Sequence, residues 1–192
     1  MRQTERTRAT TAALLDAARE LFAAHGYETT SLAAVAARAE VTKGAVYHHF
    51  DGKRQLFEAV FVTEVDRMAV PLVAAYRGAE DPWQGFAAAC RAFLTECLDP
   101  GVQRIVLRDA PAALGWEQVR RLEAPLLEMM ETAIAAACDA GRIPPRPPAL
   151  LARFLFGALC ETAMVIARAD DPGAAHRAAV AEVDRILDGF RD

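Results

Sequence analysis

The sequence predicts an all-α protein, and three observations lead to that class. Apolar residues recur at spacings of three and four positions, and no stretch alternates as a strand would. Alanine is abundant and β-branched residues are sparse, which favours helix over sheet. Hydrophobic residues make up 53% of the 192-residue chain, enough for a packed core. We expect about nine helices, with a three-helix N-terminal head and a larger helical body.

The head is expected to span residues 1–55. Its helices should begin at hydroxyl side chains, which accept hydrogen bonds from free backbone N–H groups, and end at turn residues. In chain order these markers are Gly26 as the end of a helix from about Thr10, Thr30 or Ser31 as the cap of the second helix, Thr42 as the cap of the third, and Asp51-Gly52 as a turn.

The body is expected to span residues 56–192, divided by proline and glycine. A fourth helix should start near Arg54 and end or kink at Pro71, because proline cannot donate the backbone hydrogen bond there. A stiff linker should cover residues 144–148. The remaining helices are expected over residues 82–97, 100–113, 114–141 with a kink at Pro125, 149–168 and 173–190.

The charge of the chain is unevenly distributed. Residues 1–56 hold eight Arg and Lys against six Asp and Glu, a net +2, whereas residues 57–192 hold fourteen against twenty, a net −6. The lysines of the chain, Lys43 and Lys53, both lie in the head. A small positive excess fits a face that contacts phosphate, although chance alone also produces such an asymmetry.

The third expected helix separates polar from apolar residues. Lys43, Gly44, Tyr47 and His48 fall on its outward face, whereas Val46 and Phe50 point toward a core. A short helix that presents small, polar and cationic groups on a braced surface is typical of the helix that enters a DNA groove in a helix-turn-helix.

Candidate DNA contacts come from this outward face and from helix N-termini, where backbone N–H groups attract phosphate. The small residues at 44 and 45 permit a close approach to the backbone of DNA, and the aromatic and cationic groups reach phosphates or base edges. The predicted set is Thr30, Ser31, Thr42, Lys43, Gly44, Ala45, Tyr47, His48 and Lys53.

Several head residues have alternative interpretations. Tyr47 also fits a half-buried core aromatic, and His49 also fits a packed or solvated side chain. Arg38 is either a solvated charge or a phosphate contact. Arg6 and Arg8 are expected to form an arm that reaches into the minor groove.

At these motifs the chain resembles the TetR/AcrR family of bacterial transcription regulators. The motifs that carry the resemblance are Gly26-Tyr27, Thr30-Ser31-Leu32, Val35-Ala36, Val41-Thr42-Lys43-Gly44, Val46-Tyr47-His48-His49-Phe50 and Lys53-Arg54-Gln55-Leu56. One departure is Glu40, which stands in the joint between the second and third helices, where the family usually has glycine. A left-handed backbone there adds about 1 kcal/mol of strain to a non-glycine residue.

The resemblance implies a pocket for a small hydrophobic inducer in the body. The fourth to seventh helices hold more aromatic and flexible apolar side chains than a minimal scaffold needs. For each residue alone, core packing is the alternative interpretation. The candidate lining residues are Trp83, Phe86, Phe93, Leu107, Arg108, Trp116, Met129 and Met130.

The resemblance also implies a homodimer formed through the last two helices, which lets two heads read two half-sites of double-stranded operator DNA. Large and small residues alternate in the eighth helix, for example Phe154 beside Gly157 and Ala158, which permits close helix approach. The alternative is that these stripes pack only within one chain.

The function predicted from these observations is a ligand-responsive transcriptional regulator, most simply a repressor, in the cytoplasm. An activator and a helical protein-interaction module are alternatives. No nucleophile–base pair or metal cluster indicates an enzyme, and no cofactor, metal or membrane partner is predicted. The four cysteines fit reduced, buried side chains, with a thiol-based sensor at Cys90 and Cys97 as the alternative.

Overall fold

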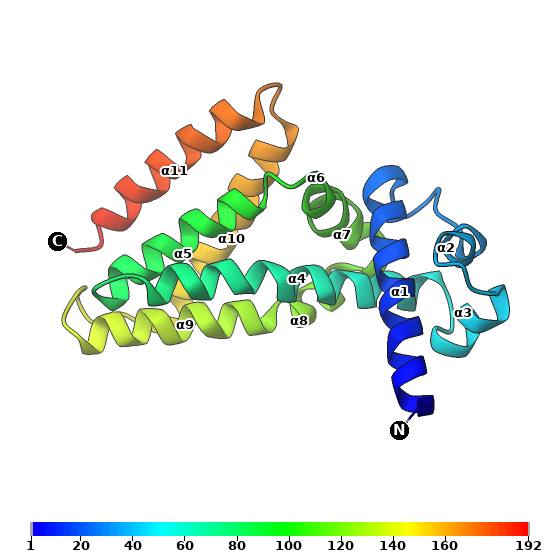
Figure 1. Ribbon diagram of the computed structural model, residues 1–192. Helices are drawn as coiled ribbons and strands as arrows, with labels where there is room; N and C mark the ends of the chain where they lie inside the picture. The colour runs from blue at the N-terminus through cyan, green and yellow to red at the C-terminus, as the bar shows by residue number, and fades with distance from the viewer. Residues whose placement is uncertain (1, 192) are drawn as a thin grey trace. The chain divides into compact units, whose positions relative to one another are not determined.

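The computed structural model describes the backbone of residues 2–191 and the side chains of residues 7–191, and the described chain is all-α, as the sequence predicts (Figure 1). A π-helix, η1, interrupts the α-helices in the middle of the chain. The elements are α1 Arg2–His25, α2 Leu32–Arg38, α3 Lys43–His49, α4 Lys53–Arg77, α5 Pro82–Glu96, α6 Pro100–Val102, η1 Gln103–Asp109, α7 Ala110–Leu114, α8 Trp116–Leu122, α9 Ala124–Asp139, α10 Pro148–Arg168 and α11 Pro172–Asp188.

Prolines behave differently in the two long helical stretches of the body. Helix α4 continues through Pro71 to Arg77, so of the two expected outcomes, an end or a kink, the end of the helix is wrong. The buried side chains of Val65 and Met68 anchor the preceding turns, and one missing backbone bond does not outweigh that packing. In the later stretch the helix breaks at Glu123, and Pro125 falls in the first turn of α9, where its missing N–H needs no partner.

The chain divides into two compact units. The first contains the residues up to Glu64 together with Pro100–Val119, and the second contains Val65–Asp99 and the residues from Arg120 onward. This division differs from the expected boundary near residue 55, because α6 and η1 pack against α1 and α7 packs against η1. The sequence pattern did not indicate that the chain leaves the second unit at residue 99 and returns at residue 120.

The core of the first unit lies between α1, α2, α3 and the start of α4. Phe22 of α1 meets Phe57 of α4 edge-on, with their ring centroids 5.0 Å apart, and both side chains are fully buried. The buried carboxylate of Glu64 accepts a hydrogen bond from Arg19 Nε at 2.7 Å. This ion pair ties α1 to α4 within the unit, because a buried charge must be paired to be tolerated.

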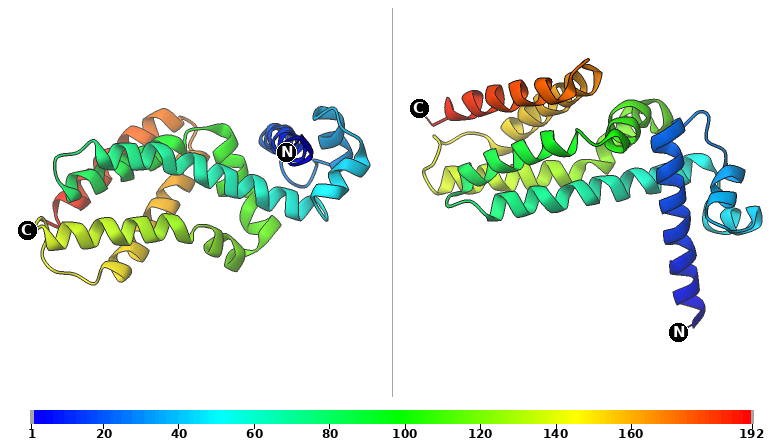
Figure 2. Two further views of the ribbon diagram at one scale, coloured as in Figure 1. Left: turned by 60° about the horizontal axis from the view of Figure 1, so that its bottom comes forward. Right: turned by 45° about the horizontal axis from the view of Figure 1, so that its top comes forward.

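The second unit is a bundle in which α5, α9, α10 and α11 pack against one another, with α11 beside α10 (Figure 2). Trp83 is buried at the start of α5, where its indole stacks on Phe86 at 5.2 Å and its Nε1 donates to the carbonyl of Leu187 at 3.2 Å. Arg91 Nη1 and Asp184 Oδ1, 2.6 Å apart, add an ion pair between α5 and α11.

Helix α10 is, by length and composition alone, long and apolar enough to cross a membrane. Leu155, Leu159 and Ile166 are nevertheless buried inside the second unit. Such burial is typical of the central helix of a water-soluble bundle, in which an apolar stripe faces neighbouring helices.

Candidate nucleic-acid interface

Hydroxyl side chains begin both helices of the candidate DNA-reading motif. Ser31 is the N-cap of α2, and its Oγ accepts a hydrogen bond from Ala34 N at 3.1 Å. Thr42 is the N-cap of α3, and its Oγ1 accepts from Ala45 N at 3.2 Å. Each cap satisfies one free N–H group and leaves others at the helix start exposed to an anion.

The joint between these helices is a Schellman turn. The Val41 amide donates to the carbonyl of Ala36 at 3.0 Å, and the Glu40 amide donates to the carbonyl of Ala37 at 3.2 Å. This pattern places Glu40 in the left-handed region, with φ of 56°. The left-handed backbone considered for this position is confirmed, and Glu40 is the one non-glycine residue with positive φ in the described part of the chain.

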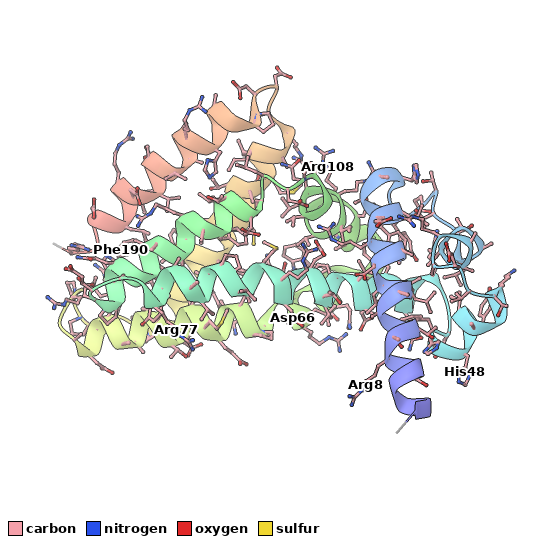
Figure 3. All side chains as sticks on the ribbon, in the orientation of Figure 1. Arg8, His48, Asp66, Arg77, Arg108 and Phe190 are labelled. Carbon is pink, nitrogen blue, oxygen red and sulfur yellow. The ribbon has the colours of Figure 1, made fainter. Side chains whose placement is uncertain are left out.

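The two faces of α3 separate as the sequence predicts. Val46 is fully buried and Phe50 is 7% exposed, so both brace the helix from behind. On the opposite flank Tyr47 is 51% exposed, which excludes the core interpretation for this ring, and His48 projects outward from α3 (Figure 3). The Nζ of Lys43 lies 5.9 Å from the centroid of the Tyr47 ring.

We call this flank the α3 reading face. It contains the exposed residues of α3 together with the exposed cap Thr42 and the half-buried Ala45 between them. Its small central residues leave room for close approach, while its ends carry an ammonium group, a phenol and an imidazole. Its members are Thr42, Lys43, Gly44, Ala45, Tyr47 and His48.

Thr30 lies apart from this exposed surface, and DNA contact at Thr30 stays a prediction. The side chain is 4% exposed, and its Oγ1 donates to the carbonyl of Gly26 at 2.8 Å. Thr30 therefore fastens the α1–α2 loop, while the neighbouring Ser31 is exposed at the start of α2.

Lys53 has internal partners that the sequence did not reveal. Its Nζ donates to the carbonyl of Tyr27 at 2.9 Å and to the carbonyl of Glu28 at 3.1 Å, and it lies 4.4 Å from the centroid of the Tyr27 ring. The ammonium group therefore donates hydrogen bonds to two backbone carbonyls of the α1–α2 loop. Phosphate contact by Lys53 stays a prediction.

Other head residues are also placed by the structure. Helix α1 begins at Arg2, so residues 2–9 are helical and not an extended arm, and Arg8 projects from that helix (Figure 3). The side chain of Arg6 lies outside the described residues. Arg38 pairs with Glu20 at 2.5 Å, and the Nδ1 of the half-buried His49 lies 3.1 Å from Thr11 Oγ1.

The second unit contains a partly open cavity of about 640 Å³ between α4, α5, α9 and α10. Four of the predicted lining residues border it, namely Phe86, Phe93, Met129 and Met130. The other four do not. Trp83 is committed to the core, and the first unit contains Leu107, Arg108 and Trp116, of which Arg108 projects from η1 (Figure 3).

The walls of the cavity are apolar, and its charged groups are exposed. Sequence reasoning missed the residues of α4 and α10, because their contribution depends on how distant helices meet. The buried wall residues are Phe86, Cys90, Phe93, Leu126, Ala133, Phe156 and Leu159, and the exposed polar residues are Arg77, Glu128 and Thr132. Burial raises the pKa of the Cys90 thiol to about 12, so this thiol stays protonated at neutral pH.

Helices α10 and α11 together present exposed apolar side chains. Leu150, Phe154 and Val165 of α10 are 68%, 66% and 59% exposed, and Ile186 of α11 is 49% exposed. Gly157 and Ala158 lie on the same exposed face of α10. Large apolar residues beside small ones are typical of a surface that packs against another helix.

Two protein-family models match the chain in succession. The model described as bacterial regulatory proteins of the tetR family matches residues 14–60, which contain the α3 reading face. The model described as the tetracyclin repressor-like C-terminal domain matches residues 83–190, which contain most of the second unit.

The chain is also similar to individual transcription regulators and to a protein of the Tn10 transposon. A solved structure of a TetR-family transcriptional regulator from Pectobacterium atrosepticum is 37% identical, covers 97% of this chain and 96% of that chain, and superposes with a TM-score of 0.85. The Transposon Tn10 TetC protein of Escherichia coli is 27% identical over 62% of this chain, and the match spans 60% of its length. The transcriptional activator FasR of Mycolicibacterium smegmatis is 38% identical over 42% of this chain and 36% of its own length.

Proposed function

Because the chain belongs to the TetR family of DNA-binding transcription regulators, we propose that it is a homodimeric repressor that a small apolar effector releases from operator DNA. The observation that carries this proposal is the α3 reading face, which is polar and cationic on its exposed flank and braced by Val46 and Phe50 behind. Regulators of this family are soluble cytoplasmic proteins and not enzymes.

The chemistry of the reading face supports binding in the major groove. The capped start of α3 directs free N–H groups and the helix dipole toward a phosphate. Lys43 supplies a positive charge whose attraction to phosphate is weakened by salt. Tyr47 supplies a hydroxyl group and a ring that fits a thymine methyl, and Gly44 lets the protein backbone come close to the DNA. Ser31 provides a second helix start for the neighbouring strand.

DNA binding is tested with the fragment upstream of the protein's own gene. The double variant Lys43→Ala with Tyr47→Ala should bind about a hundredfold more weakly, because each change removes contacts from both heads of a dimer. Lys43→Ala alone should lower the slope of log affinity against log salt by about 2, one contact per head. The measurement is a gel shift at several salt concentrations.

The matched control is Arg121→Ala, which removes an exposed positive charge from the body. It should bind the fragment as the unaltered protein does. Equal affinity of the double variant and the unaltered protein would contradict the assignment of the reading face.

We propose that the dimer forms through the exposed faces of α10 and α11. Their apolar residues are solvated in one chain and become buried when a second copy packs on them, which stabilises association in proportion to the area covered. Sedimentation should give twice the chain mass of 20.8 kDa. Phe154→Glu should yield a monomer and lose operator binding, whereas Val70→Glu, at an equally exposed position on α4, should remain a dimer.

The effector class follows from the cavity. Its buried walls carry no charged side chain, and an ion transferred there without a partner loses its hydration. The proposed effector is therefore an uncharged apolar molecule. The volume of the cavity falls in the range of ordinary small-molecule sites.

Nile red, an uncharged apolar dye, is a suitable probe. Its fluorescence should rise on binding to the unaltered protein and to Ala74→Phe, which enlarges an exposed side chain outside the cavity. Ala89→Phe, which fills space at the cavity wall, should abolish the signal. Equal dye binding by both variants would place the site elsewhere.

Repression and activation are distinguished by transcription. A reporter joined to the upstream fragment should be silenced by the protein and restored by compounds that displace Nile red. FasR, a relative over part of the chain, is named an activator, and a rise in reporter output with the protein would favour that function.

A further inference from the structure

The π-helix η1 brings together two charged side chains that an α-helix would separate. Arg104 and Asp109 are five residues apart, a spacing that leaves about 140° between two side chains on an α-helix. The i→i+5 hydrogen bonding of a π-helix stacks such residues above one another. As a result Arg104 Nε lies 3.3 Å from Asp109 Oδ2.

Both side chains contact the backbone where α1 turns into the loop before α2. Asp109 Oδ2 accepts a hydrogen bond from the Tyr27 amide at 2.7 Å, and Arg104 Nη2 donates to the carbonyl of His25 at 3.2 Å. Between them Gly26 has φ of 82°, and a Cβ at this position would lie 2.1 Å from Arg104 Nη2. Glycine adopts this positive φ without strain, and its missing side chain leaves the space that the Arg104 guanidinium occupies.

The same loop leads directly to the start of α2. The Thr30 hydroxyl is bonded to the carbonyl of Gly26, and Ser31 then caps the helix. Lys53 holds the loop through the carbonyls of Tyr27 and Glu28. Side chains of both α4 and η1 thus hold the loop through hydrogen bonds to its backbone. The contacts from η1 depend on its π-helical winding.

We propose that Arg104 and Asp109, paired by the π-helix, are positioning residues for the DNA-reading motif, and that they set the start of α2 through the backbone of His25–Tyr27. This inference rests on the proposed function, because it concerns regulation of the same head. Residues 100–119 join the second unit at both ends of the segment. A change from π-helical to α-helical winding there would turn Asp109 away from Arg104 and free the Tyr27 amide.

The first test is amide hydrogen exchange, which needs no DNA. In Asp109→Ala the Tyr27 amide should exchange at least tenfold faster, because it loses a charged acceptor. The Ala34 amide, bonded to the Ser31 cap, should also exchange faster, while the Gly26 amide, bonded to Phe22 O, should not change. Acceleration at Tyr27 without acceleration at Ala34 would overturn the proposal.

The second test uses the upstream DNA fragment. Asp109→Ala should bind about tenfold more weakly with an unchanged salt slope, because no phosphate contact is lost. Asp109→Asn, which keeps an acceptor for the Tyr27 amide, should recover part of the affinity, and Glu117→Ala, an exposed acid in α8, should bind as the unaltered protein does. Unaltered or increased affinity of Asp109→Ala would overturn the proposal.

The two failures are distinguishable. If the unaltered protein binds no DNA, the proposed function fails, while the exchange rates at Tyr27 and Ala34 still decide whether Arg104 and Asp109 position α2. If Asp109→Ala loses circular dichroism or melts at a much lower temperature, Arg104→Ala gives the same measurements while the Asp109 acceptor for Tyr27 is kept. Normal exchange at Ala34 in that variant would refute the positioning role.

Discussion

The two compact units hold their candidate sites in opposite ways. The first presents an exposed, polar α3 face on a short helix whose caps and core residues all lie within residues 42–50. The second contains a partly open apolar cavity whose wall is assembled from α4, α5, α9 and α10. The contrast teaches that a surface site can be local in sequence, whereas a cavity depends on packing between distant segments.

The largest expected effect comes from replacing one aromatic residue by alanine in each unit and comparing the two losses of stability. Phe86→Ala should lower the free energy of unfolding by about 3–5 kcal/mol, because the ring is 2% exposed and leaves a void. Tyr47→Ala should change it by less than about 0.5 kcal/mol, because the ring is half exposed. Urea unfolding measures both, and comparable losses would mean that Tyr47 also supports the core.

A second test uses the thiols, all of which lie in the second unit. Burial raises the pKa of Cys90 and Cys97 to about 12, so the folded state keeps protons that the unfolded chain releases above its ordinary pKa of about 9. Stability is therefore unaffected below about pH 9 and falls above it, by about 1.4 kcal/mol per pH unit for each thiol.

The measurement compares the unaltered protein with Cys90→Ala by urea unfolding between pH 8 and pH 10.5. The variant should lose less stability with rising pH, since it lacks one of the buried thiols. Parallel losses in the two proteins would show that Cys90 ionises as easily in the folded state as in the unfolded state.

The smallest test compares two Schellman turns, one in each unit. Gly141 follows α9 with φ of 62° and the same hydrogen-bond pattern as Glu40 after α2. Glu40→Gly should stabilise the protein by about 1 kcal/mol, and Gly141→Ala should destabilise it by a similar amount. A Cβ at Gly141 meets nothing within 4 Å, so that loss would report backbone conformation alone.

Glu40→Ala is the control for the charge of Glu40, because it removes the carboxylate and keeps the Cβ in the left-handed conformation. Thermal unfolding of the three variants separates the two effects. A stability gain in Glu40→Ala as large as that in Glu40→Gly would assign the gain to charge instead of strain.

Local features of the head were predictable from sequence for a clear physical reason. The caps Ser31 and Thr42 act on amides three residues away, and the spacing of Val46 and Phe50 already places them on one face. The left-handed conformation of Glu40 was expected because the family that the head resembles usually has glycine at this joint. Thr30 and Lys53 were less predictable, because their partners depend on how the α1–α2 loop folds back.

The amino-acid sequence by itself determined the helical class, the starts and ends of most helices and the composition of the α3 reading face, since these follow from contacts within a few residues. Tertiary structure alone decided that Phe156 and Leu159 join Phe86 around the cavity, and that η1 winds as a π-helix whose Arg104 and Asp109 meet the α1–α2 loop. These arrangements bring together residues dozens of positions apart, and such pairings leave no periodic signal along the chain.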